Sequence, residues 1–109
     1  MKRFGVIALA MAAAVHSLPA AAMDADAADK LVRKSKCLTC HAVDKKKDGP
    51  SFKESAEKYR GKPEAMDKLT KHVTVPSKVK VDGKEEDHET LKTDDPAAVK
   101  NVVEWILSR

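Results

Sequence analysis

The chain has 109 residues with a formal net charge of +4, and 35% of its residues are charged while 4% are aromatic. This length supports one small domain, and so few aromatic side chains predict a thin hydrophobic core. The weak positive charge does not favour nucleic acid as a partner.

The first 22 residues have the features of a secretory signal peptide. A basic start is followed by an apolar run from Phe4 to Val15, and three alanines at 20–22 form a small-residue cleavage site. The run is too short to span a bilayer as a helix. We predict cleavage near Ala22, a periplasmic mature domain of residues 23–109 and no membrane span in it. An N-terminal helix retained in the mature protein is the alternative.

Cleavage changes the charge only slightly. Loss of Lys2 and Arg3 leaves 19 Lys plus Arg against 17 Asp plus Glu, a net charge of +2. Nucleic acid is therefore still not expected as a partner.

Residues 24–36 predict the first helix of the mature domain. Acidic residues stand early in this segment and basic residues late, which suits the helix macrodipole. Ala28, Leu31, Val32 and Ser35 recur at spacings of three and four. This stripe of small residues would let another helix approach closely.

Residues 37–41 read Cys-Leu-Thr-Cys-His and contain both cysteines of the chain. Two thiols at this spacing can each add to one vinyl group of a haem, and the histidine that follows can bind the iron. We therefore predict one covalently attached haem c at Cys37, Cys40 and His41. A disulfide would close only a tiny loop and stabilise little. Thiol–disulfide exchange or zinc binding by the two cysteines is the competing reading, but the thioredoxin-like alternation of strands and helices is missing.

A polar loop follows the motif and ends at Gly49 and Pro50. Its three lysines, Lys45, Lys46 and Lys47, are either a docking patch for an acidic redox partner or simply a solvated loop.

Two further helices are predicted in the middle of the chain. The Ser-x-x-Glu pattern at Ser51 is a capping box ahead of Phe52, and Gly61 ends that helix. Pro63 is predicted to start the next helix, which stops by Val75 because Pro76 follows.

Residues 75–93 are the least regular part of the mature chain. Val79, Lys80 and Val81 alternate and Asp82-Gly83 is a turn dipeptide, but the charged residues 84–87 do not predict a returning strand. We expect a loop along the haem edge.

The final helix has the clearest pattern. Asp95 is its predicted cap and Pro96 its first residue. Its apolar face consists of Val99, Val102, Val103, Ile106 and Leu107. Trp105 lies off the centre of this face and is expected at a helix contact, at a haem edge or simply in the core.

The motif at 37–41, Gly49-Pro50, the helix from Phe52 and the final helix with Trp105 together resemble the small bacterial class I cytochromes c. The resemblance covers nearly the whole mature chain. It implies an all-α fold of about four helices around one covalently bound haem. It also implies that the carbonyl group of Pro50 accepts a hydrogen bond from the proximal histidine, which makes the other ring nitrogen a better donor to iron.

This chain departs from the family pattern at the sixth iron ligand. The family usually supplies a methionine from the loop before the last helix, and residues 75–94 contain none. Counting back from Trp105, His88 falls near that position, so we predict an iron bound by His41 and His88. Imidazole is a stronger donor than thioether, and the potential should be lower than in a His/Met relative.

Other residues remain candidates for the sixth position. Met66 is the first alternative, although its spacing to Leu69 and Val73 is also typical of a core methionine. His72 is the second, and an open or water-bound position is the third. His88 itself stands among acidic residues, where a histidine is usually just solvated.

The predicted function is transfer of single electrons between periplasmic or membrane-bound redox proteins. No acid–base pair, Ser-His-Asp set or phosphate loop accompanies the motif, so we do not expect an enzyme. If the sixth ligand is displaceable, the same domain would instead bind or sense a small gas.

Overall fold

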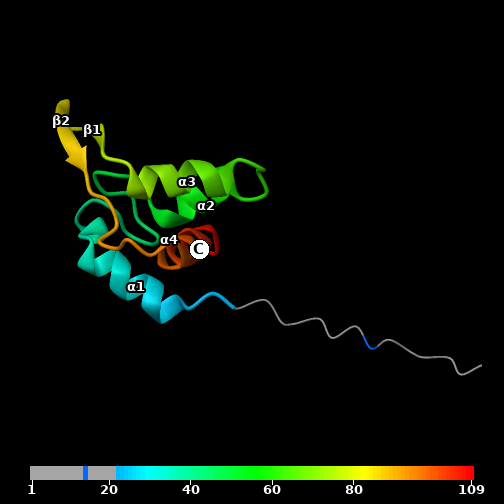
Figure 1. The fold of residues 1–109 in the computed structure, drawn as a ribbon. Helices are drawn as coiled ribbons and strands as arrows, with labels where there is room; N and C mark the ends of the chain where they lie inside the picture. The colour runs from blue at the N-terminus through cyan, green and yellow to red at the C-terminus, as the bar shows by residue number, and fades with distance from the viewer. Residues whose placement is uncertain (1–13, 15–21) are drawn as a thin grey trace, which may run out of the picture.

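The computed structural model describes residue 14 and residues 22–109, so the predicted signal peptide lies almost wholly outside the described residues. The described chain contains four α-helices, one short 3₁₀ helix and one β-hairpin (Figure 1). In order these are α1 (Ala25–Lys34), η1 (Cys37–Thr39), α2 (Phe52–Tyr59), α3 (Ala65–Thr74), β1 (Ser77–Val81), β2 (Lys84–His88) and α4 (Pro96–Leu107). Within the described ranges, no helix has the length and apolar content needed to cross a membrane.

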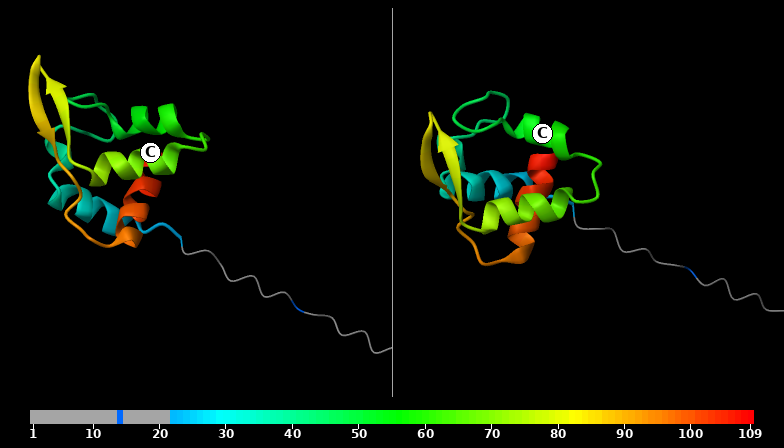
Figure 2. Two further views of the ribbon diagram at one scale, coloured as in Figure 1. Left: turned by 45° about the horizontal axis from the view of Figure 1, so that its top comes forward. Right: turned by 90° about the horizontal axis from the view of Figure 1, so that it is seen from above.

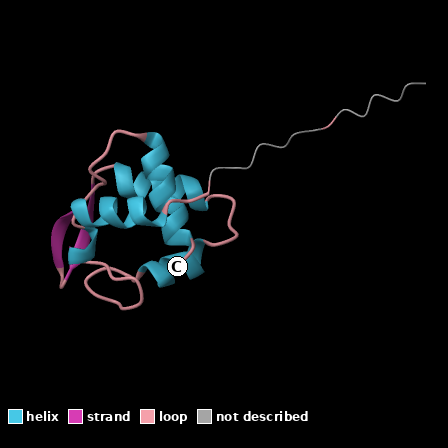
Figure 3. Cartoon of the chain, turned by 90° about the horizontal axis from the view of Figure 1, so that it is seen from below, coloured by secondary structure: helices cyan, strands magenta, loops and turns pink. Residues whose placement is uncertain are grey.

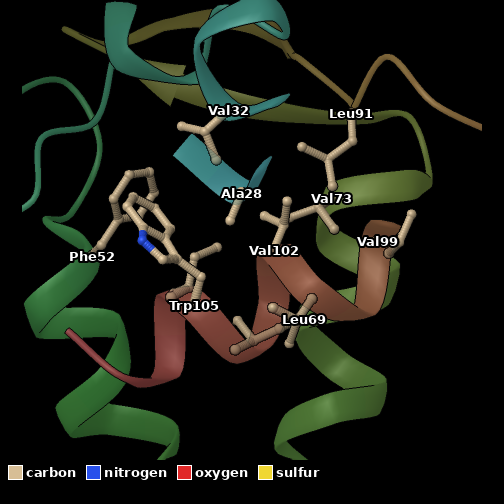
Figure 4. Close-up of a cluster of buried hydrophobic side chains, with 11 residues drawn as sticks. Ala28, Val32, Phe52, Leu69, Val73, Leu91, Val99, Val102 and Trp105 are labelled. Carbon is tan, nitrogen blue, oxygen red and sulfur yellow. The ribbon is translucent and has the colours of Figure 1, made fainter. Parts of the chain in front are cut away.

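Helix α4 is the centre of the packing, because α1, α2 and α3 all pack against it (Figures 1 and 2). Its apolar face supplies buried valines and Ile106, which meet Val32 of α1 and Leu69 of α3 in one cluster (Figure 4). Trp105 is only 4% exposed, and its ring meets that of Phe52 edge-on at a centroid distance of 5.5 Å. The tryptophan therefore serves the core and the contact between α4 and α2.

The predicted helix ends are largely confirmed. Asp24 and Asp95 cap α1 and α4 by accepting hydrogen bonds from backbone N–H groups, and Ser51 forms the predicted capping box with Glu54. Helix α3 begins at Ala65, so the prediction that Pro63 is its first residue is wrong. The two preceding residues form a turn, which is closed by a hydrogen bond from the N–H group of Ala65 to the carbonyl oxygen of Lys62 at 3.2 Å.

The prediction of a loop over residues 75–93 is wrong for residues 77–88, which form an antiparallel hairpin. Positive φ angles of 50° at Asp82 and 79° at Gly83 make the tight turn that right-twisted strands favour. The charges that argued against a second strand pair across the hairpin. Lys78 forms an ion pair with Asp87, and Lys80 stands directly opposite Glu85.

The chain after the hairpin is tied to two helices. The N–H group of Leu91 donates to the carbonyl oxygen of Val73 at 2.8 Å, and Leu91 is buried in the core. The next N–H group, of Lys92, donates to the hydroxyl oxygen of Ser35 at 2.9 Å. Ser35 is fully buried at the end of α1, so this hydroxyl group fixes the returning chain against that helix.

Replacing Ser35 should loosen this return. We expect Ser35→Ala to lower the free energy of unfolding by about 1 kcal/mol, because it removes the acceptor of the Lys92 N–H group. Chemical denaturation measures the change. Ser55→Ala, which removes the same atom from α2, should be neutral or slightly stabilising because alanine has the higher helix propensity. An unaffected Ser35→Ala protein would show that the contact contributes nothing.

Candidate cofactor site

A cavity of about 620 Å³ lies against the core and is lined by residues of η1, α2, α3 and the hairpin. Cofactor sites in proteins are commonly of this size and mostly apolar. The hairpin stands at the edge of the molecule beside the helices (Figure 3). The face that carries Val79, Glu86 and His88 contributes to the cavity wall.

The Cys-x-x-Cys-His motif forms a tight turn at one wall. Lys36 adopts the left-handed conformation with φ of 61°, and the carbonyl oxygen of Cys37 accepts from the N–H group of His41 at 3.0 Å. This turn brings Cys37, Cys40 and His41 to the same cavity. Burial raises the pKa of the Cys37 thiol. A redox-active dithiol is favoured by the opposite shift.

The ring of His41 is fixed on two sides. Its Nδ1 lies 2.6 Å from the carbonyl oxygen of Pro50, the contact that the family resemblance implies. The ring also stacks on Phe52, with a centroid distance of 5.4 Å and an interplanar angle of 22°. Because the protonated Nδ1 donates a hydrogen bond to the carbonyl oxygen of Pro50, Nε2 keeps the lone pair that binds a metal.

Gly49 leaves room for this ring, a role that sequence reasoning did not assign. A Cβ atom at position 49 would lie 2.6 Å from Cε1 and 2.9 Å from Nδ1 of His41, closer than carbon atoms approach. The N–H group of Gly49 also donates to the carbonyl oxygen of Cys40 at 2.8 Å. The loop therefore returns to the motif at a point where only glycine fits.

His88, from the end of β2, faces His41 with a distance of 6.2 Å between ring centroids and an interplanar angle of 73°. Two imidazoles on opposite faces of one metal ion, each with a bond of about 2 Å, have ring centres about 6 Å apart. Nδ1 of His88 is buried and has no hydrogen-bond partner among the described residues. The protein therefore does not engage this ring through Nδ1, and the ring remains able to bind a metal.

His72 also lines the cavity, and its ring centroid lies 4.0 Å from that of His88. Partial desolvation, followed by the proximity of the other histidines, lowers the pKa of both His72 and His88. A lowered pKa favours the neutral ring, the form in which imidazole binds a metal. Sequence reasoning named the two residues as rivals and missed their contact, since 16 positions separate them.

Met66 lies elsewhere. It is half-buried against the hydrophobic core, and the cavity is lined by no methionine within the described part of the chain.

Of the three lysines at 45–47, Lys47 already forms a hydrogen bond, because its Nζ donates to the carbonyl oxygen of Leu38 at 2.9 Å.

The comparisons with known proteins agree on one family. The profile of the Cytochrome c family, described as cytochrome c, matches residues 25–109. Cytochrome c-551 of Stutzerimonas stutzeri is 38% identical over 73 residues, which cover 67% of each chain. Cytochrome c-551 of Azotobacter vinelandii is 32% identical over 83 residues, which cover 73% of this chain and 94% of the relative.

Two crystal structures show the same fold. The class 1 cytochrome MtoD of Sideroxydans lithotrophicus ES-1 is 54% identical, with a TM-score of 0.75, and the match covers 80% of this chain and 97% of that one. Cytochrome c552 of Nitrosomonas europaea is 28% identical, with a TM-score of 0.57, and the match covers 73% and 96%.

The glycine beside His41 gives a direct test of the site. Gly49→Ala should lower the free energy of unfolding by about 1–3 kcal/mol, because the added methyl group pushes the ring from its place against Pro50. Its haem absorption and paramagnetic resonance spectra should change as well. Gly61→Ala is the control. It strains a left-handed residue with φ of 78° that has open space around its Cβ, so stability should fall while the spectra stay as in the wild type.

A Gly49→Ala protein with wild-type stability and spectra would contradict the steric argument. The same conclusion would follow if Gly61→Ala changed the haem spectra as much as Gly49→Ala does.

Proposed function

This chain belongs to the cytochrome c family, and on that premise we propose that it is an exported single-electron carrier whose haem iron is bound by His41 and His88. The family binds one covalently attached haem c and is a family of electron carriers rather than enzymes. We assign the attachment to Cys37 and Cys40. The observation that carries the proposal is the distance of 6.2 Å between the ring centroids of His41 and His88 at the cavity.

Several features favour His88 over the other candidates for the sixth ligand. Its distance from His41 suits two ligands of one iron, and its Nδ1 is free of hydrogen bonds within the described residues. Met66 packs on the core instead of the cavity wall. His72 lies beside the ring of His88 and has no close ring contact with His41 among those recorded for the described chain.

The residues of this chain provide two imidazoles that would hold the haem iron in a low-spin state. When bound, the haem supplies an iron that changes its charge by one electron. His41 and His88 are a ligand set that serves both oxidation states, so neither ligand has to leave during transfer. Apolar side chains such as Val32, Phe52 and Leu69 keep water from the inner wall of the cavity. Replacing thioether by imidazole stabilises the ferric state, and we expect a lowered potential.

The lysine loop is a candidate docking surface. Lys45 and Lys46 are exposed in the loop that follows the motif, whereas Lys47 holds that loop to Leu38. We propose that Lys45 and Lys46 steer an acidic periplasmic or membrane-bound redox protein toward the haem edge. Export of the mature chain from Met23 onward, after cleavage near Ala22, is part of this proposal.

Removing His88 tests the ligand assignment. We expect His88→Ala to convert the oxidised protein from a low-spin to a high-spin iron, because an axial imidazole is lost, and to let the reduced protein bind carbon monoxide. Paramagnetic resonance and absorption spectra measure both. Met66→Leu should keep the wild-type spectra.

The double variant His72→Ala/His88→Ala removes the neighbouring imidazole as a substitute ligand. A low-spin spectrum that persists in the double variant would refute the assignment, as would its loss in Met66→Leu. Prompt binding of carbon monoxide by the wild-type protein would favour gas binding over electron transfer.

The docking proposal has a separate test. Lys45→Glu/Lys46→Glu should slow electron transfer to ferricyanide several-fold at low ionic strength, because the anion loses its attraction to the haem edge, and the difference should shrink as salt rises. Stopped-flow absorbance measures the rates. Lys30→Glu/Lys34→Glu makes the same charge change on α1, outside the lining of the cavity, and is the control. An equal effect of the control pair would leave no specific role for the loop.

A further inference from the structure

The two proposed iron ligands are held in different ways. His41 donates a hydrogen bond to Pro50 and stacks on Phe52, so both its tautomer and its ring plane are fixed. His88 has no hydrogen bond on its buried Nδ1 within the described chain. A restraint on the rotation of the His88 ring has to come from contacts other than a hydrogen bond of Nδ1.

The hairpin alone cannot supply that restraint. Among residues 22–109, strands β1 and β2 pair only with each other, and most of their residues are exposed. The turn of the hairpin projects beyond the helices in Figure 1 and in the left view of Figure 2. A single two-stranded hairpin is marginally stable in water. A ligand at the end of β2 therefore depends on contacts with the rest of the domain.

We propose that His72 is the residue that positions the ring of His88. The two ring centroids are 4.0 Å apart and the ring planes differ by 36°, which is a tilted stack of two flat rings. This contact joins the end of β2 to the last turn of α3. The inference rests on the proposed binding of the iron by His88.

Helix α3 is a firm support for this contact. Leu69 and Val73, which flank His72 on the helix, are both buried in the core. The carbonyl oxygen of Val73 also accepts from Leu91, three residues beyond His88. Core packing and the hydrogen bond to Leu91 thus hold the part of α3 that carries His72. The ring of His88 can pack against the ring of His72.

The position of the His88 ring has a measurable consequence. In a low-spin ferric haem with two imidazole ligands, the g-values depend on the angle between the ring planes. That angle is 73° between His41 and His88. Release of the His88 ring would change this angle or spread it over a range of values.

The test uses the oxidised holoprotein. His72→Ala should stay low-spin, since His88 still binds, but its g-values should shift or its lines broaden. Cyanide, which binds the iron only after His88 leaves, should bind about 2- to 10-fold faster, because an aromatic pair is lost. His72→Phe keeps a flat ring at this position and should restore both properties toward the wild type. Lys71→Ala, on the same turn of α3 but outside the lining of the cavity, should change neither.

Each result of these measurements supports or contradicts the proposed role of His72. Wild-type g-values and a wild-type cyanide rate in His72→Ala would overturn the proposal, and so would a His72→Phe protein as perturbed as His72→Ala. A high-spin His72→Ala protein would make His72 itself the ligand and would overturn the assignment of His88 as well. A failure confined to positioning therefore leaves the proposed function intact, because His88→Ala reports on that function separately.

Discussion

The hydrogen bond from Nδ1 of His41 to the carbonyl oxygen of Pro50 is the contact on which the site depends. It requires the loop after the motif to fold back within 2.6 Å of the ring, and the loop can do so only because Gly49 has no side chain. The same return places Ser51 as the cap of α2 and Phe52 against the ring. One contact thus fixes the tautomer of His41, the start of a helix and one wall of the cavity.

The thin hydrophobic core and the cavity are related, because they share residues. Residues that form the core, such as Val32, Leu69 and Val102, also line the cavity of about 620 Å³. A domain of this size buries little apolar surface by itself. The covalently bound haem of the family therefore completes the core as well as carrying the electron, and binding and folding are linked.

Local patterns predicted the helices well, because capping residues and apolar periodicity act over a few positions. Asp95, Pro96 and the buried face of α4 are examples. The hairpin was missed because its stability comes from pairs such as Lys78 with Asp87, which a reading along one strand does not reveal. The motif predicted the haem cofactor that the family binds. The contact between His72 and His88, in contrast, exists only once the hairpin folds back on α3.

The hairpin also explains how an acidic, exposed segment can contain a histidine whose pKa is lowered. Glu85 and Asp87 stand opposite lysines in the register of the hairpin, so their charges are balanced across the strands. Alternation then turns His88 to the other face, which shares the cavity wall with Val79. Partial desolvation there lowers the pKa of His88 despite its acidic neighbours, since Glu89 contributes less than burial and the other histidines. The strand register, more than the local sequence composition, places this residue at the cavity, as the proposed iron ligand requires.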